Sequence, residues 1–532
     1  MWEQIVKNKR LEWVCWGLCV LALLFAMLAR RPWFDEAQAW QIAKTASIYD
    51  IVFTIPHYEG HPPLWHLVLV PFAKTGIPWQ LGLRFVGLLC SAWAFFLLIF
   101  KAPFARWIRL VLPFTYFLFY QYGAIIRPYG IFFLLMLLLA IVFPKKDQSP
   151  GIFVFLLAAL CAIHAYGIAV AGGIVLAWMW DIKQTVTFKQ YFQLILHDKR
   201  FTWLGGLLIW AGCIIWITYP AFDAFAKHLI CNTPHWKQLL YLVFVLPLDA
   251  TLLNVWNNDE VMCNIALQTS SFWWMVPLGC GMWTIFFSCL PKKKLLYFVL
   301  PFGLLLSVMK IYSSNHHIGI LAFICIFFAW ISLQADRSFS PKPFVKKIGI
   351  LALAFSCIVS IRWSAVNLYL DIKYPAFPGK ELVSFLKKHQ LMQLNTFTSW
   401  MILNEAQGLF GEDTNIPRYA MEITFYANQN FITNFNHGSS RAYVLHRRST
   451  VPMNRDTLIQ WQKKGIPDVL LGDVPLHHIF PNGKMLKRQF APVYIVRMYV
   501  LWKDNKPNPF TIPVLVRKDL LNSHHLTPIS VK

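Results

Sequence analysis

The chain has 532 residues, of which 57% are hydrophobic and 14% are charged, and its net charge is +24. A soluble globular chain carries roughly 25% charged residues, so the composition excludes an ordinary soluble protein. The positive charge does not indicate nucleic-acid binding, because Lys and Arg recur between apolar segments instead of forming one patch. Basic loops of this kind fit contacts with membrane lipids and lipid phosphates.

Apolar segments recur at the length that crosses a bilayer, which is about 20 residues. The first follows a basic start and is expected to be an uncleaved anchor, since a cleaved signal peptide has a shorter apolar core. Segment 62–75 is too short to span and is expected to be a re-entrant or interfacial helix. About eleven spans are predicted, at 11–29, 83–100, 108–125, 128–143, 151–168, 169–182, 202–219, 272–290, 295–312, 317–334 and 348–366.

The basic residues also predict the topology. Alternate loops are basic, as loops on the cytoplasmic side of a membrane are. The N-terminus is therefore expected in the cytoplasm and the first loop, 30–82, outside. A long loop at about 220–271, which contains an amphipathic segment, falls outside as well. An odd number of spans places the region from about 370 outside too.

The C-terminal region has shorter apolar runs and more polar and turn residues. The segment GKELVSFLKKHQ has helical spacing, and RAYVLH, DVLLGD, VYIVRMYVLW and TIPVLVR have strand character. The predicted fold is thus a polytopic α-helical membrane protein with a C-terminal extracytoplasmic α/β domain. The membrane part is expected at 1–369 and the soluble domain at 370–532.

Most of the 11 cysteines lie inside apolar runs, where they act as small hydrophobic residues. No CxxC motif occurs, so a thiolate zinc site is not expected. Cys231 and Cys263 lie in polar contexts of the long outer loop. An oxidising compartment would favour a disulfide between them, and two unpaired thiols are the alternative.

Two adjacent acids, Asp35 and Glu36, follow directly after the first span. Ionisable residues at membrane depth are costly and usually functional. Acids are also favourable in the first turn of a helix, and Asp is a good N-cap. Catalysis and helix capping are therefore both open interpretations of this pair.

The segment PHYEGHPPLWHL carries His57, Glu59, His61 and His66, and its two prolines favour the start of a helix. Solvated polar groups of an interfacial loop are the simpler interpretation, and substrate binding is the other. The spacing matches no strong zinc motif.

Further polar residues are predicted at the outer ends of spans: Arg127, Tyr129, His164, His316 and His317. An Arg in this position either extends its charged end to water or holds a lipid phosphate with its planar guanidinium. A single His there is more often structural than catalytic. All of these motifs point to one side of the membrane, however, and this favours a shared site.

Together the motifs resemble those of the GT-C glycosyltransferases, in particular the bacterial branch near the aminoarabinose lipid A transferases and the protein O-mannosyltransferases. The resemblance covers roughly the first 170 residues, and beyond them only the architecture. Its motifs are Asp35-Glu36 after the first span, HPPLW at 61–65, Arg84 near the start of a span, Arg127-Pro128-Tyr129, the late pair His316-His317 and, more loosely, His164-Ala165-Tyr166.

The resemblance implies a GT-C fold and a polyprenyl-phosphate sugar as donor. The acceptor would be lipid A, a glycan or a protein, at the outer face of the bacterial cytoplasmic membrane. No cofactor is certain; a divalent metal ion is compatible, although the second outer loop offers Arg127 and no carboxylate. The implied residues are Asp35 as base, Glu36 to orient it, and Glu59, His61, Arg127, Tyr129, His164, His316 and His317 for the donor phosphate and substrate.

Two other functions fit the composition. A transporter or flippase of lipid-linked sugars would carry its charges near the middle of the membrane and would not need a soluble outer domain. An O-antigen polymerase or ligase would have a large outer loop between late spans instead of an acidic pair after the first span.

Overall fold

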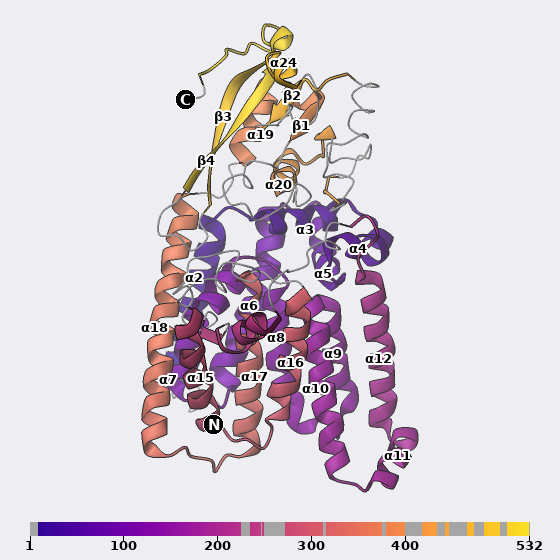
Figure 1. Cartoon of the computed structure of the whole chain (residues 1–532), viewed down its shortest axis with the longest axis vertical. Coiled ribbons are helices and arrows are strands. Elements are labelled where there is room, and N and C mark those ends of the chain that lie inside the picture. The colour runs from indigo at the N-terminus through magenta and orange to yellow at the C-terminus, as the bar shows by residue number, and fades with distance from the viewer. Residues whose placement is uncertain are drawn as a thin grey trace.

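The computed structural model describes residues 9–224, 235–245, 247–248, 272–311, 315–374, 379–398, 418–433, 442–445, 465–472, 483–500 and 508–530. These residues are mostly helical. The helices form a tall bundle, and a small sheet lies beyond one end of it (Figure 1).

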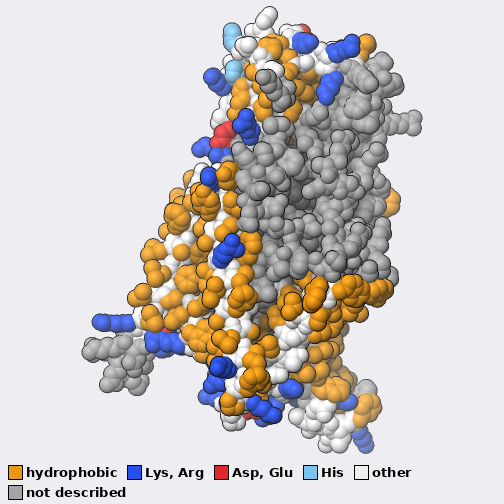
Figure 2. Space-filling view, turned by 60° about the vertical axis from the view of Figure 1, so that its left-hand side comes forward, with side chains coloured by type: hydrophobic (Ala, Val, Ile, Leu, Met, Phe, Trp, Pro, Cys, Tyr) orange, Lys and Arg blue, Asp and Glu red, His pale blue; other side chains and the backbone are white. Residues whose placement is uncertain are grey.

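Five of the described helices are long and apolar enough to cross a membrane, which indicates a membrane protein. Figure 2 shows hydrophobic side chains over the flank of the helical part and Lys and Arg side chains near its lower end, as expected where a bilayer surrounds the helices. The five are α2 (Arg10–Ala29), α6 (Trp79–Lys101), α10 (Ala165–Gln184), α12 (Lys199–Thr218) and α18 (Pro343–Lys373).

The remaining predicted spans coincide with shorter or broken helices, so the number eleven stays a prediction. Predicted span 108–125 is not one helix, because the chain there forms α7 (Arg106–Val111), the 3-10 turn η2 (Leu112–Phe114) and the π-helix η3 (Phe117–Ala124). Pro113 lacks an N–H and therefore interrupts the helix. The shorter helices are α8 (Tyr129–Val142), α9 (Pro150–Ile163), α15 (Phe272–Ser288), α16 (Leu296–Ile311) and α17 (Ile320–Ala335).

The predicted boundary between spans 151–168 and 169–182 is wrong. The break falls at His164, whose extended backbone separates α9 from α10. Its Nδ1 accepts a hydrogen bond from the Tyr166 N–H at 3.1 Å and so caps α10. The apolar residues on both sides hide this break from a hydropathy pattern, and His164 is left buried at the junction.

The predicted first outer loop is largely helical. It forms α3 (Phe34–Thr45), the π-helix η1 (Asp50–Thr54), α4 (Pro56–Glu59) and α5 (Leu64–Ala73). The short apolar α5 packs against α3 and α6 and buries Trp65 and Leu69. Through these contacts the helices of this loop cover the end of the bundle that faces the sheet (Figure 1).

The C-terminal region contains a four-stranded sheet in the order β1-β2-β4-β3. The described parts of the predicted runs DVLLGD, VYIVRMYVLW and TIPVLVR contribute to strands β2, β3 and β4, and GKELVSFLKKHQ contains α19. Strands β1 and β2 are parallel and the other pairs are antiparallel. The elements are β1 (Thr396–Thr398), β2 (Val469–Leu471), β3 (Phe490–Val500), β4 (Asn508–Arg517), α19 (Gly379–Lys388) and α20 (Arg418–Ala427).

The expectation that RAYVLH forms a strand is wrong for its described part, residues 442–445, which joins no described strand. Val444 instead exchanges two hydrogen bonds with the side-chain amide of Gln38 on α3. The Val444 N–H donates to Gln38 Oε1 at 3.2 Å, and Gln38 Nε2 donates to the Val444 carbonyl. The amide takes the place of a neighbouring strand, while Tyr443 and Leu445 pack against Ile42.

The predicted disulfide lies outside the described residues, since neither Cys231 nor Cys263 is among them. The same holds for most of the predicted loop 220–271, apart from α13 (His235–Leu240), the π-helix η6 (Tyr241–Val245) and a few neighbouring residues. At the predicted domain boundary, α18 continues to Lys373, four residues past the predicted end of the membrane part.

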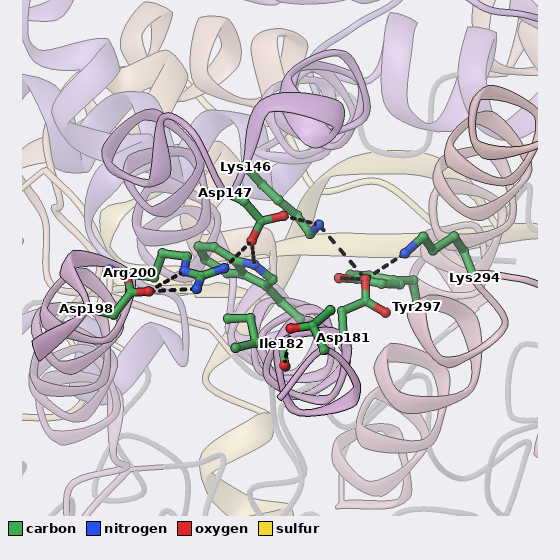
Figure 3. Close-up of polar contacts among 10 residues, drawn as sticks. Lys146, Asp147, Asp181, Ile182, Asp198, Arg200, Lys294 and Tyr297 are labelled. Atoms are coloured by element: carbon green, nitrogen blue, oxygen red, sulfur yellow. Dashed lines mark hydrogen bonds and ion pairs between the residues drawn. The ribbon is translucent and has the colours of Figure 1, made fainter. Parts of the chain in front are cut away.

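A polar network joins several helices (Figure 3). It includes Arg200 at the start of α12, which lies at the end of the bundle remote from the sheet (Figure 1). Asp147 lies at the centre of the network and accepts hydrogen bonds from Lys146 at 2.9 Å, Arg200 at 3.1 Å and the indole of Trp178 at 2.9 Å. Lys146 is buried and lies 3.9 Å from Asp181. The network thereby ties the loop after α8 to the end of α10 and the start of α12.

Asp181 extends this network to α16, and its removal should lower stability. Its Oδ2 accepts hydrogen bonds from Lys294 at 2.7 Å and from the Tyr297 hydroxyl at 3.0 Å. Hydrogen bonds to charged groups contribute about 1.5–3 kcal/mol each, so Asp181→Ala should visibly lower the unfolding temperature in detergent. Asp336→Ala is the control, because its partner Lys293 is largely exposed. Equal losses in both variants would contradict a stabilising network.

Glu422 makes stability depend on pH where α20 meets α19. Burial raises the pKa of this carboxyl well above its ordinary value, opposed by the Gly379 N–H. The folded protein therefore keeps a proton that the unfolded chain loses, and stability falls as pH rises above the ordinary carboxyl value. Glu422→Gln should remove this loss, so the unfolding temperature of the variant minus that of the wild type should grow from about pH 5 to about pH 8. A constant difference would contradict the assignment.

Candidate functional site

Residues from five separate parts of the sequence meet where α3 lies on the bundle. Arg127, just before α8, contacts Asp35 at 2.9 Å. The ring centre of His164 lies 4.8 Å from that of His61, 5.2 Å from that of Tyr129 and 5.9 Å from that of His317. His316 is adjacent, with its ring centre 4.0 Å from that of His317.

The two opening acids have different surroundings. Helix α3 begins after Trp33, and the Trp33 N–H donates to Glu36 Oε2 at 2.7 Å. Glu36 is therefore the acid that caps the start of α3. Asp35 is left to pair with Arg127.

Glu36 is buried and joins three segments of the chain. Both of its oxygens accept hydrogen bonds from the Arg30 guanidinium, at 2.9 and 2.7 Å, and Oε1 also accepts from the Ile126 N–H at 2.7 Å. Arg30 also pairs with Asp371 on α18 at 2.9 Å. Because Ile126 directly precedes Arg127, Glu36 fixes the distance between the two members of the Asp35–Arg127 pair.

Glu36→Gln should therefore destabilise the protein. Breaking a buried ion pair by removing one partner costs about 3–5 kcal/mol, part of which Asp371 offsets by continuing to neutralise Arg30. Glu381→Gln is the control, because its pair with Arg31 is partly exposed. Thermal unfolding in detergent should show a clear loss for the first variant and a small one for the second. The reverse order would contradict the positioning role of Glu36.

Arg127 is a buried cation held between two aromatic rings. Its guanidinium carbon lies 5.4 Å from the ring centre of Trp33 and 5.3 Å from that of Tyr129. Only 6% of its side chain is exposed, against 26% for Asp35. The pair therefore has its cation on the bundle side and its anion on the more accessible side.

His164 lies buried beside this pair, and its contacts fix the position of its proton. Because His164 Nδ1 accepts from the Tyr166 N–H, its proton lies on Nε2. This buried Nε2 has no partner among the described residues and is available to an acceptor oxygen.

The polar residues of PHYEGHPPLWHL do not share one place. His61 joins the histidine group, whereas Glu59 accepts a hydrogen bond from Gln38 at 3.0 Å. His57 lies against α12, 2.6 Å from the Tyr219 carbonyl, and lines a surface cavity of about 510 Å³ there. His66 is buried on α5. The proline-rich segment thus distributes its polar groups over four surroundings.

Helix α3 is also held by the C-terminal region, which sequence reasoning missed. Gln41 Nε2 donates to the Thr424 carbonyl at 3.1 Å, and Lys44 donates to Asn428 at 2.8 Å. Together with the Gln38–Val444 bonds they make a polar face along α3. The spacing of 38, 41 and 44 by three residues is a signal that the sequence contains, since such residues share one helical face.

Within the part of the chain that the structure describes, no group of three or more His, Cys, Asp or Glu side chains is arranged to hold a metal ion. No model of a known protein family matches the chain, and no curated protein matches it. The GT-C resemblance therefore remains an expectation from motifs.

Proposed function

We propose that this chain is a glycosyltransferase that moves a sugar from a polyprenyl-phosphate donor to an envelope acceptor, whether lipid A, a glycan or a protein. The reaction would take place at the outer face of the bacterial cytoplasmic membrane. The observation that supports this most is the Asp35–Arg127 pair at one end of an apolar helical bundle. A lipid-borne phosphate needs an apolar surrounding for its tail and a cation at its head.

Arg127 suits the phosphate of such a donor. A planar guanidinium binds phosphate oxygens through two parallel hydrogen bonds, and the rings of Trp33 and Tyr129 fix its orientation. The N–H of His164 Nε2 offers a second donor nearby. Donors that are fixed in place before the reaction stabilise the charge that develops on a departing phosphate.

Donor binding would change the partner of Arg127. In this structure Asp35 neutralises the guanidinium at 2.9 Å. A donor phosphate is also an oxyanion and competes for the same N–H groups. The displaced Asp35 carboxylate, which is the more exposed member of the pair, then becomes free to accept a proton. The base is thus activated only when the donor has bound.

The reaction itself is a substitution at the anomeric carbon of the sugar. The acceptor oxygen forms a bond to this carbon while its hydroxyl proton passes to the Asp35 carboxylate. The bond from the anomeric carbon to the phosphate oxygen breaks through an oxocarbenium-like state. Its electron pair stays with the phosphate, which leaves as polyprenyl phosphate beside Arg127.

Mass spectrometry of envelope glycans, lipid A and glycoproteins tests this function in a strain that lacks the gene. The proposal predicts that one sugar substituent is missing and that the wild-type chain restores it. An unchanged set of envelope sugars in the deletion strain would contradict the proposal. Accumulation of an unused lipid-linked sugar in the same strain would support it.

A further inference from the structure

Helix α11 (Phe188–His197) is a separate feature at the foot of α12, at the end of the molecule remote from the sheet (Figure 1). Its start is capped by Thr187 and Gln190, where the Thr187 N–H donates to Gln190 Oε1 at 3.0 Å. Its end joins Asp198, which accepts a hydrogen bond from the Arg200 N–H at 2.8 Å and caps α12. Arg200 in turn contacts Asp147 in the network of Figure 3, so the corner between the two helices is fixed.

Helix α11 has apolar side chains that pack against the bundle and others that are exposed. Tyr191 and Leu194 pack against the bundle, and the ring of Tyr191 lies edge-on to that of Phe201 at 5.6 Å. Phe188 and Leu196 are 70% and 77% exposed, and Ile195 is exposed as well. Positions 188, 195 and 196 lie within one helical stripe. These three exposed side chains form an apolar surface on α11.

The surroundings of this face indicate lipid. The next helix, α12, is of membrane length, and its Leu208, Ile209 and Trp216 are strongly exposed. Lys183, Lys189 and Lys199 precede, begin and follow α11 and are all exposed. Apolar residues flanked by lysines are typical of helices that lie in the plane of a membrane interface.

We propose that α11 binds the surface of a bilayer that contains anionic lipids. Phe188, Ile195 and Leu196 enter the boundary between headgroups and acyl chains, and the lysines contact the lipid phosphates. A lysine close to an anionic membrane surface strengthens binding by about fivefold. The contact anchors the end of the bundle that carries the Figure 3 network, and it is independent of the proposed enzymatic activity.

Spin labels on the full-length protein in nanodiscs test the proposal. Leu196→Cys places the label on the apolar face, and Gln193→Cys places a matched control at an exposed polar position of the same helix. Both carry Cys213→Ser, because Cys213 is an exposed thiol. Collisions with oxygen, which partitions into lipid, are compared with collisions with a water-soluble nickel chelate. We expect the label at residue 196 to collide more often with oxygen and the label at residue 193 to collide more often with the nickel chelate.

More frequent collisions of the label at residue 196 with the nickel chelate than with oxygen would overturn the membrane contact. Protection of residue 196 from both reagents would place a second protein copy on this face and would also overturn it. The charge component is measured by comparing discs of phosphatidylcholine alone with an equal mixture of phosphatidylcholine and phosphatidylglycerol. The anionic lipid should increase the oxygen preference, and replacing Lys183, Lys189 and Lys199 by Gln should remove that increase. No effect of phosphatidylglycerol on the original protein would refute the role of the lysines.

Discussion

Asp35→Asn is expected to lower the rate of sugar transfer by about 100- to 10,000-fold, the usual loss when a general base is removed. The amide keeps the size of the side chain but cannot take the acceptor proton. The helix should still form, because Glu36 and not Asp35 accepts the hydrogen bond that caps α3. Transfer is measured by adding purified variants to membranes from the deletion strain and following the sugar that the strain lacks.

Asp50→Asn is the matched control for this prediction. Asp50 lies in the same predicted outer loop, and its carboxylate accepts a hydrogen bond from Ser47 at 2.8 Å, outside the histidine group. The control should transfer sugar at close to the wild-type rate. If Asp35→Asn did so too, Asp35 would not be the base and the proposed reaction would lack one.

Arg127→Ala should weaken donor binding and turnover together, because Arg127 would hold the phosphate before and during the reaction. Loss of a fixed donor to a developing anion typically lowers kcat by about 100- to 1,000-fold, and KM for the donor should rise. Arg127→Lys should be intermediate, since Lys keeps the charge but not the two parallel N–H groups. Steady-state kinetics at varied donor concentration separates the two effects.

Arg362→Ala provides the control, because Arg362 is an exposed arginine on α18 that lies over Trp363. It should leave both constants unchanged. A variant Arg127→Ala with wild-type KM and kcat would show that the guanidinium only neutralises Asp35, which would remove the phosphate ligand from the proposed mechanism.

The sequence predicted that several of these residues would share a surface, because two strong physical signals agree. Apolar runs mark the helices, and basic loops mark one side of the membrane. Arg127 follows one predicted span, His164 lies near the end of a second and His317 begins a third, yet all fall on the same predicted side as Asp35. The structure brings these four residues into one group, although the number of spans and their sidedness remain predictions.

Contacts that connect distant segments were not predictable in the same way. The Gln38 amide meets Val444 across 406 positions of sequence, and no local pattern in RAYVLH distinguishes pairing with an amide from pairing with a strand. The division of roles between Asp35 and Glu36 also depends on distant groups, since the position of Arg127 decides which acid pairs with it. His164 interrupts a continuous apolar run because its side chain caps α10, and a hydropathy pattern does not reveal such a cap.

Binding of polyprenyl phosphate to the purified protein tests most directly whether Arg127 exchanges Asp35 for a donor phosphate. Titration of the wild type, Asp35→Asn and Arg127→Ala with undecaprenyl phosphate, each compared with undecaprenol, isolates the phosphate contribution. We expect Asp35→Asn to bind the phosphate more tightly than the wild type, because the competing carboxylate is gone, and Arg127→Ala to bind it more weakly. All three proteins should bind undecaprenol, which has no phosphate, with equal affinity. Equal affinity of all three proteins for undecaprenyl phosphate would contradict the exchange.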